Sequence, residues 1–221
     1  FSGKHPDFNI VAGFFLEKKI KINGLKSYKL KKYILSVKIV ILYVKTHLIS
    51  IATVVYKAFQ SFTLSPYKSN SGGEFALVHS KVAFKNIKKL KFKLTYFYDD
   101  IHFKNPPNNE AVSFYKTISI IEYVKLIPKA FIYTNSILRK LITTSKFMIG
   151  DFGTLQAINF FSARIGHFIL VREAYQNIFK NHPGVKFYSG EKESRYGILA
   201  NNFSIEYSNF AIAIPHGLSY S

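Results

Sequence analysis

Short apolar runs and helix-spaced apolar positions alternate along this chain and predict strands and helices in turn. FALVHS (75–80) and KLTYFYDD (93–100) are compact apolar runs typical of strands, and residues 81–91 between them place apolar side chains close to helical spacing. A strand, a helix and a second strand in this order predict a β-α-β unit with parallel strands. The class of fold expected is therefore α/β.

Residues 184–221 predict a second unit of the same kind. The pattern gives a strand over 185–191, a helix over 194–208 and a strand over 210–217 that ends in a turn. The run FAIAI (210–214) has the near-continuous hydrophobicity of a parallel strand covered on both faces. A right-handed crossover would bring the ends of both strands to the carboxyl edge of the sheet, where open α/β sheets bind ligands.

Asp99 and Asp100 follow the strand of the first unit and belong to the same predicted edge. A solvated strand end or a helix cap explains such a pair, and so, with less support, does a metal-binding DxD motif, which would need a third residue. The six histidines other than His216 have no partners at ligand spacing, so no metal site and no cofactor is assigned.

Two further segments predict long helices. Residues 25–59 are apolar and free of Pro and Gly, with Lys31, Lys38 and Lys45 spaced by seven along one stripe. They suit either a pair of core-packed helices or an interfacial helix on anionic lipid; charges in the middle argue against a transmembrane span. Residues 151–181 also have helical spacing, with Gly153 and Gly166 as possible breaks.

The composition narrows the classes of function. With 221 residues and 48% hydrophobic content the chain can bury a core, and the absence of cysteine excludes disulfides and thiolate chemistry. The net charge is +19, yet only four of the 31 basic residues are arginine, the residue that base readout and bidentate phosphate recognition favour. Dinucleotide, P-loop, zincin and nucleophile-elbow motifs are absent from the sequence.

The last unit supplies the candidate site. Gly190 and Glu191 end its first strand, Arg195 opens its helix, and Pro215-His216-Gly217 closes its second strand. This layout resembles the middle of bacterial surface-polysaccharide glycosyltransferases of GT-B type. It is similar to the Gln-His-Gly motif of the CDP-glycerol glycerophosphotransferases and capsular polysialyltransferases, with Pro215 where those families carry Gln.

The resemblance implies a fold and a reaction. The chain would be one Rossmann-like, acceptor-side domain over residues 1–221, a parallel sheet flanked by helices and the N-terminal half of a GT-B architecture. A donor-binding domain would follow residue 221, and the chain alone would be inactive. His216 would be the general base on an acceptor hydroxyl, while Gly190, Glu191, Arg195 and Gly217 would bind substrate.

The implied substrates are a nucleotide-activated sugar as donor and a saccharide or glycolipid as acceptor, in capsule, lipooligosaccharide or other surface-polysaccharide biosynthesis. The chain would be cytoplasmic or peripheral on the inner face of the cell membrane, where Lys31, Lys38 and Lys45 could meet anionic lipid. The alternative is a basic, aromatic-rich module that binds RNA or another anionic polymer, since 37 aromatic residues are interleaved with lysine. Few arginines and no RNP-like motif make specific nucleic-acid binding the weaker expectation.

Overall fold

The computed structural model describes residues 25–62, 73–90, 92–100, 103, 106–107, 111–190 and 195–214. The chain divides into two compact units. Phe1–Tyr56 and Tyr123–Ile169 make the first, called here the helical unit, and Lys57–Glu122 and Leu170–Ser221 make the second, called the sheet unit. Each is described by itself.

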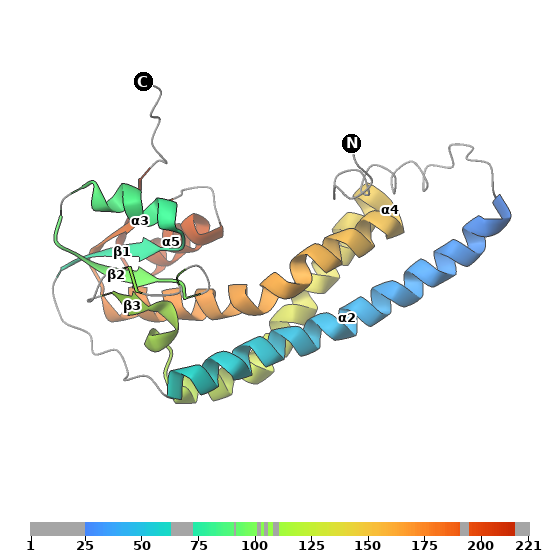
Figure 1. Ribbon diagram of the computed structural model, residues 1–221, viewed down its shortest axis with the longest axis horizontal. Coiled ribbons are helices and arrows are strands. Elements are labelled where there is room, and N and C mark those ends of the chain that lie inside the picture. Colours follow the sequence, from blue (N-terminus) through green and yellow to red (C-terminus); the bar gives the residue numbers. More distant parts are fainter. Residues whose placement is uncertain are drawn as a thin grey trace, which may run out of the picture. The chain divides into compact units, whose positions relative to one another are not determined.

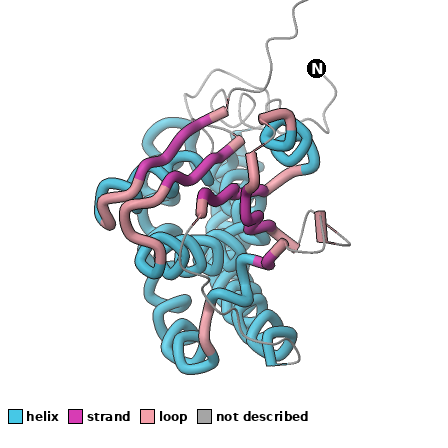
Figure 2. The backbone as a smooth tube through the Cα atoms, turned by 90° about the vertical axis from the view of Figure 1, so that its left-hand side faces the viewer, coloured by secondary structure: helices cyan, strands magenta, loops and turns pink. Residues whose placement is uncertain are grey.

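The sheet unit is built on five parallel strands. They are β1 (Glu74–Val78), β2 (Leu94–Tyr98), β3 (Val112–Ser113), β4 (Lys186–Ser189) and β5 (Phe210–Ala213). Their order across the sheet is β3-β2-β1-β4-β5, and every neighbouring pair is parallel (Figures 1 and 2). The expected α/β class and the two predicted parallel pairs, β1 with β2 and β4 with β5, are confirmed.

Helices cover both faces of this sheet because side chains alternate along each strand. Ala76, Val78 and Tyr96 point to one face, where they pack with Ile87 of α3 (Lys81–Lys88). On the opposite face Phe187 stacks on Phe179, near the end of α4, at 4.0 Å between ring centroids. Phe179 in turn lies 6.4 Å from Phe203 of α5 (Arg195–Glu206). The core is therefore two layers of rings and aliphatic side chains, one on each side of the sheet.

The direction of the connections changes once. From β1 the chain passes through α3 to β2, toward one edge of the sheet. The long helix α4 (Ile120–Asn181) then connects β3 to β4, which lies on the other side of β1, and α5 leads on to β5 at the opposite edge. Right-handed crossovers in opposite directions place α3 and α5 on opposite faces, as observed. The sheet order thus reverses between β1 and β4.

The helical unit consists of α2 (Leu25–Phe62) and most of α4. Figure 1 shows α4 turning back on itself, which divides it into a first arm that includes Phe131 and a second arm that includes Gly166. The helix α2 contacts both arms. The His47 ring lies 4.8 Å from that of Phe131 on the first arm. On the second arm, a Cβ added at Gly166 would meet the Ser50 Cα at 2.9 Å. The three helical segments therefore pack side by side.

Two expectations about these helices were wrong. Residues 25–59 form one helix, α2, and not a pair. Gly153 and Gly166 do not end α4, which continues as helix through both although it turns back on itself between its two arms. Their small size serves packing instead: both are buried, and Gly166 lets the α2 backbone come close. By length and composition Ser36–Ser61 could cross a membrane, although its charges had argued against a span; 22% of its most apolar stretch is buried.

The expectation for the last strand was also wrong in one respect. β5 is an edge strand of the described sheet, pairing with β4 alone, and its side chains are mostly exposed. Phe210 is 62% exposed. Continuous hydrophobicity in FAIAI therefore does not reflect cover on both faces among the described residues.

Candidate functional site

Polar side chains gather at the carboxyl edge of the sheet in the sheet unit. His79 follows β1, Asp99 and Asp100 follow β2, Ser113 ends β3, and Gly190 follows β4. Because the strands are parallel, all four ends meet at the same edge. The predicted placement of the Asp99-Asp100 pair and of Gly190 at one edge is confirmed.

Asp99 is the centre of this group. Its side chain is fully buried and accepts two hydrogen bonds from tyrosine hydroxyls. Tyr115, in the short 3-10 helix η1 (Phe114–Thr117), donates to Oδ1 at 2.9 Å, and Tyr196, in the first turn of α5, donates to Oδ2 at 3.3 Å. One carboxylate therefore joins β2, η1 and α5 at the carboxyl edge.

The tyrosines around Asp99 are held in the protonated form. Burial, reinforced by the negative charge of Asp99, raises the pKa of the Tyr115 hydroxyl far above its ordinary value. Burial likewise raises the pKa of Tyr175 on α4, with Tyr196 and Asp99 contributing, which places this third hydroxyl in the same electrostatic neighbourhood. Tyr175 is fully buried, and its hydroxyl has no hydrogen-bond partner among the described residues.

Asp100 is less buried than Asp99 and has a different environment. Desolvation raises its pKa, while a hydrogen bond to Ser113 and the charge of Lys57 act in the opposite direction. The Lys57 ammonium lies 4.5 Å from the centroid of the Tyr115 ring, a cation-π contact beneath the acidic pair. Asp100 Oδ1 is buried without a hydrogen-bond partner in the described part of the chain. Because this oxygen is buried, a ligand hydroxyl would reach it only after a neighbouring side chain moves.

His79 completes the group on the β1 side. Its ring is buried and stacks on Tyr196 with centroids 4.4 Å apart and planes 14° apart. The stack fixes the Tyr196 ring, whose hydroxyl reaches Asp99. The edge thus combines a buried, fully engaged carboxylate with a second carboxylate that retains a free oxygen, an arrangement suited to binding a hydroxyl-bearing ligand.

The other predicted site residues are not all placed. Arg195 is the first residue of α5, with its side chain outside the description, and Gly190 is buried beyond β4. Glu191, His216 and Gly217 lie outside the described residues. Sequence reasoning missed Tyr115, Tyr175 and Tyr196. In a chain with 15 tyrosines, nothing in the local pattern singles out these three.

Within the described ranges no group of three His, Asp or Glu side chains could hold a metal ion. No protein-family model matches this chain, and no curated protein or solved structure matches it either. The assignment of a function therefore depends on the geometry of the carboxyl edge and on the sequence motif of residues 190–217.

Proposed function

We propose that this chain is a glycosyltransferase or polyol-phosphate transferase domain of Rossmann-like fold, acting in capsule, lipooligosaccharide or other cell-surface polysaccharide biosynthesis. The observation that carries the proposal is the reversal of sheet order between β1 and β4. In open parallel sheets ligands bind at such a reversal, outside the carboxyl ends of the strands. His79 and Gly190 flank that position from the two central strands.

The chemistry of the edge suits a saccharide acceptor. Asp100, with its free buried oxygen, would accept a hydrogen bond from a sugar hydroxyl, and Asp99 with its tyrosines would fix the surrounding backbone. Gly190 leaves room for close approach at the end of β4. From the resemblance, His216 would remove the proton of the attacking hydroxyl, and Gly217 would allow substrate near the backbone.

Two further roles are proposed on the same resemblance. Arg195, at the start of α5, would meet an anionic group of the donor or acceptor, helped by the positive end of the helix. Glu191 would orient His216 or a sugar hydroxyl. No cofactor is proposed, because the nucleotide-activated sugar is itself the activated substrate. A cytoplasmic location at the inner face of the membrane would give access to such donors and to membrane-linked acceptors.

The geometry favours this function over an RNA-binding module. Stacking on nucleobases needs exposed rings. The largest fully buried side chains include eight aromatic residues: Phe75, Phe97, Phe114, Tyr115, Tyr123, Tyr175, Phe179 and Phe187. Many of the rings that the sequence interleaves with lysine therefore belong to the cores of the two units.

Binding of the acceptor is the direct test. The chain would be titrated with a panel of mono- and oligosaccharides while the backbone amide signals are followed by NMR. We expect shifts at residues beside the ends of β1 and β4, weakened about 10-fold by Asp100→Asn, the usual scale for one hydrogen bond to a charged group. Glu206→Gln is the matched control, because α5 ends at the opposite edge of the sheet.

Turnover tests the reaction itself. Transfer from CMP-, UDP- and CDP-activated donors would be measured for the wild type and for His216→Ala, with an expected loss of about 10²-fold or more for removal of a general base. Saccharide shifts elsewhere on the protein, or full activity in the His216 variant, would contradict the assignment. RNA affinity that falls steeply with salt, without any saccharide response, would favour the binding module.

A further inference from the structure

The helix α2 exposes large apolar side chains and buries several polar ones, the reverse of the usual arrangement in a water-soluble bundle. Its inward face carries Thr46, His47 and Ser50 beside the apolar Val54, all buried. The outward face carries five large aliphatic residues, all at least 41% exposed, and we call this set the α2 apolar face. It consists of Val37, Val40, Ile41, Val44 and Leu48.

The rest of the helical unit agrees with this reversal in part, because the two α4 arms also bury large apolar side chains, namely Leu126, Leu138, Ile158, Ile165 and Ile169. The buried positions of the two α4 arms include small and hydroxyl-bearing residues, namely Thr134, Ser145, Thr154, Ser162 and Gly166. Helices that pack through small and hydroxyl-bearing residues, with large apolar side chains outside, are typical of a lipid environment. In water, burial of large apolar side chains would instead drive the packing. Together with the exposure of the α2 apolar face, these small-residue contacts favour an apolar solvent on that side of the helix.

The positive charge of the helical unit indicates what kind of apolar surface the α2 apolar face binds. Residues 25–56 and 123–169 contain twelve lysines and arginines and a single acidic residue, Asp151. Lys38 and Lys45 are exposed and lie two helical turns apart along one border of the α2 apolar face. An apolar stripe bordered by lysines complements a leaflet that contains anionic lipid.

The packing of α2 bears on whether it crosses the membrane or lies parallel to the membrane surface. α2 contacts both arms of α4 close to the middle of Ser36–Ser61, through His47 with Phe131 and through Ser50 at Gly166. If α2 spanned the bilayer, both arms of α4 would lie at the same depth in the bilayer as the middle of α2. They carry exposed cations, namely Lys125, Lys129, Arg139, Lys140 and Arg164. Cations facing the hydrocarbon are strongly disfavoured, so the exposed cations of the arms argue against the spanning arrangement.

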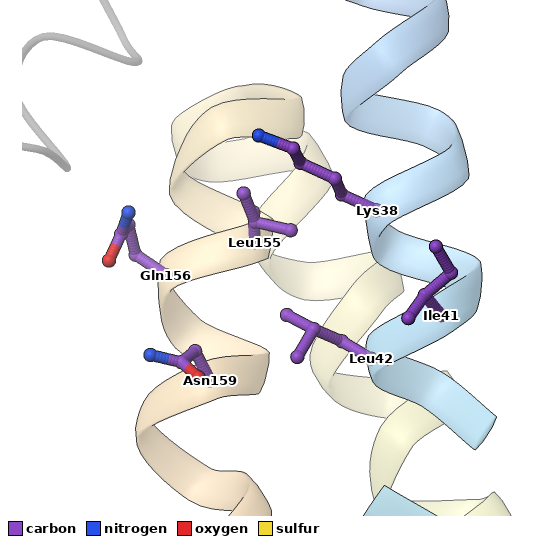
Figure 3. Close-up of a pocket in the computed structure, with 6 residues that line it drawn as sticks. All are labelled: Lys38, Ile41, Leu42, Leu155, Gln156 and Asn159. Carbon is purple, nitrogen blue, oxygen red and sulfur yellow. The ribbon is translucent and has the colours of Figure 1, made fainter. Parts of the chain in front are cut away.

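We infer that the α2 apolar face lies in the plane of a membrane, inserted into an anionic leaflet with Lys38 and Lys45 at the lipid headgroups. A pocket of about 280 Å³ adjoins this face between α2 and the second arm of α4. Its lining combines Ile41, Leu42 and Leu155 with Lys38, Gln156 and Asn159, and Figure 3 shows the Lys38 side chain extending toward the second arm above Leu155. Apolar walls beside an ammonium suit the junction of an acyl chain with a phosphate headgroup.

This inference goes beyond the proposed transfer reaction and does not depend on it. Tryptophan fluorescence tests it, because the chain has no Trp and a single introduced one reports its own position. Leu48→Trp would be mixed with vesicles of phosphatidylcholine and phosphatidylglycerol that carry bromine at chosen acyl depths. We expect emission to shift to shorter wavelength and quenching to be strongest for shallow bromine. Val40→Trp provides a second position should the first variant not fold.

Matched controls separate insertion from general charge attraction. Phe92→Trp in the sheet unit, 53% exposed, should show neither the shift nor the quenching. Lys38→Gln with Lys45→Gln should lower the partition coefficient by roughly 30-fold, about fivefold for each lysine. Lys81→Gln with Lys85→Gln removes the same charge from exposed positions of α3 and should lower it far less.

Three results would overturn the inference. Strongest quenching by bromine at the bilayer centre would mean that α2 spans. Short-wavelength emission from Leu48→Trp without vesicles, unchanged on adding them, would mean that protein covers this face, either another part of the chain or a second copy. An equal response from Phe92→Trp would mean that binding is not specific to α2.

Discussion

The central strands of the sheet unit and the helix α2 of the helical unit differ in where they place most of their large apolar side chains. In the sheet unit Phe75, Phe97 and Phe187 are buried between the sheet and its helices. In α2 of the helical unit Val40 and Leu48 are more than 60% exposed, whereas Thr46 and Ser50 are buried. The central strands thus follow the rule for water, whereas the exposed face of α2 has the pattern on which the inferred membrane contact rests. The difference teaches that burial, and not hydrophobicity alone, shows which solvent a helix meets.

The largest expected effect tests this contrast directly. Phe187→Ala removes a fully buried ring from a central strand and should lower the free energy of unfolding of the sheet unit by about 3–5 kcal/mol. Leu48→Ala removes a large side chain from an exposed helix position and should change stability by about 0.5 kcal/mol or less. Urea unfolding in mild detergent, followed by hydrogen exchange of β1 and α2 amides, measures both.

The two outcomes are separable. A loss of several kcal/mol in Leu48→Ala would show that this side chain is packed against protein, and the contrast between the units would fail. A small loss in Phe187→Ala would show instead that the stacked rings of the sheet unit repack around the cavity. Vesicle binding by Leu48→Ala should fall while its unfolding stays close to that of the wild type.

A smaller effect is expected where the helices of the helical unit approach most closely. Gly166→Ala would bring a Cβ to 2.9 Å from the Ser50 Cα, a backbone atom that cannot move alone. The helices must separate, with an expected loss of about 1–3 kcal/mol, typical of overpacking. Helix propensity alone predicts the opposite sign, a gain of about 1 kcal/mol. Hydrogen exchange of the α2 amides shows whether Gly166→Ala stabilises or destabilises the helical unit.

Ala163→Gly is the control for this comparison. Residue 163 is exposed one turn before Gly166, so only propensity should act there, with a loss of about 1 kcal/mol. If Gly166→Ala stabilised the helical unit while Ala163→Gly destabilised it, propensity would govern both positions. The close packing of α2 on the second arm would then be wrong.

The sheet unit was largely predictable because its signals are local. The apolar runs at 75–80 and 93–100 gave β1 and β2, and residues 184–221 gave β4, α5 and β5 in order. The position of β5 at the edge was not predictable, because strand order depends on contacts between distant segments. The same limit explains the site: Asp99 was found by its place after a strand, whereas Tyr115 and Tyr196 reach it from other segments.

The helical unit was less predictable because its small residues look like helix breakers. Gly153 and Gly166 suggested interruptions, yet α4 continues as helix through both. In water-facing helices such residues are costly, but in a tightly packed bundle they allow close approach. The pattern of 25–59 showed the basic stripe, and only burial showed that the polar side faces inward.

The smallest expected effect concerns pH and separates the sheet unit from the helical unit once more. His182, just after α4, is buried against Phe75 with ring centroids 4.3 Å apart, and desolvation lowers its pKa from 6.5. Between the lowered value and 6.5 the unfolded chain binds more protons than the folded one. The stability of the sheet unit should therefore decrease as the pH falls below about 6.5 and be fully retained above it.

His182→Phe isolates this effect, since it keeps a ring against Phe75 and removes the titrating group. The urea midpoints of the variant and the wild type would be measured from β1 amides at pH 7.5, 6.5 and 5.5. The variant should become more stable relative to the wild type as the pH falls. Asp100, whose pKa is raised, acts in the opposite direction in both proteins and cancels in the difference. A difference that stays constant with pH would show that His182 is not held neutral by the fold. The amides of α2 up to Tyr56 should respond less than those of β1, because His182 lies in the sheet unit.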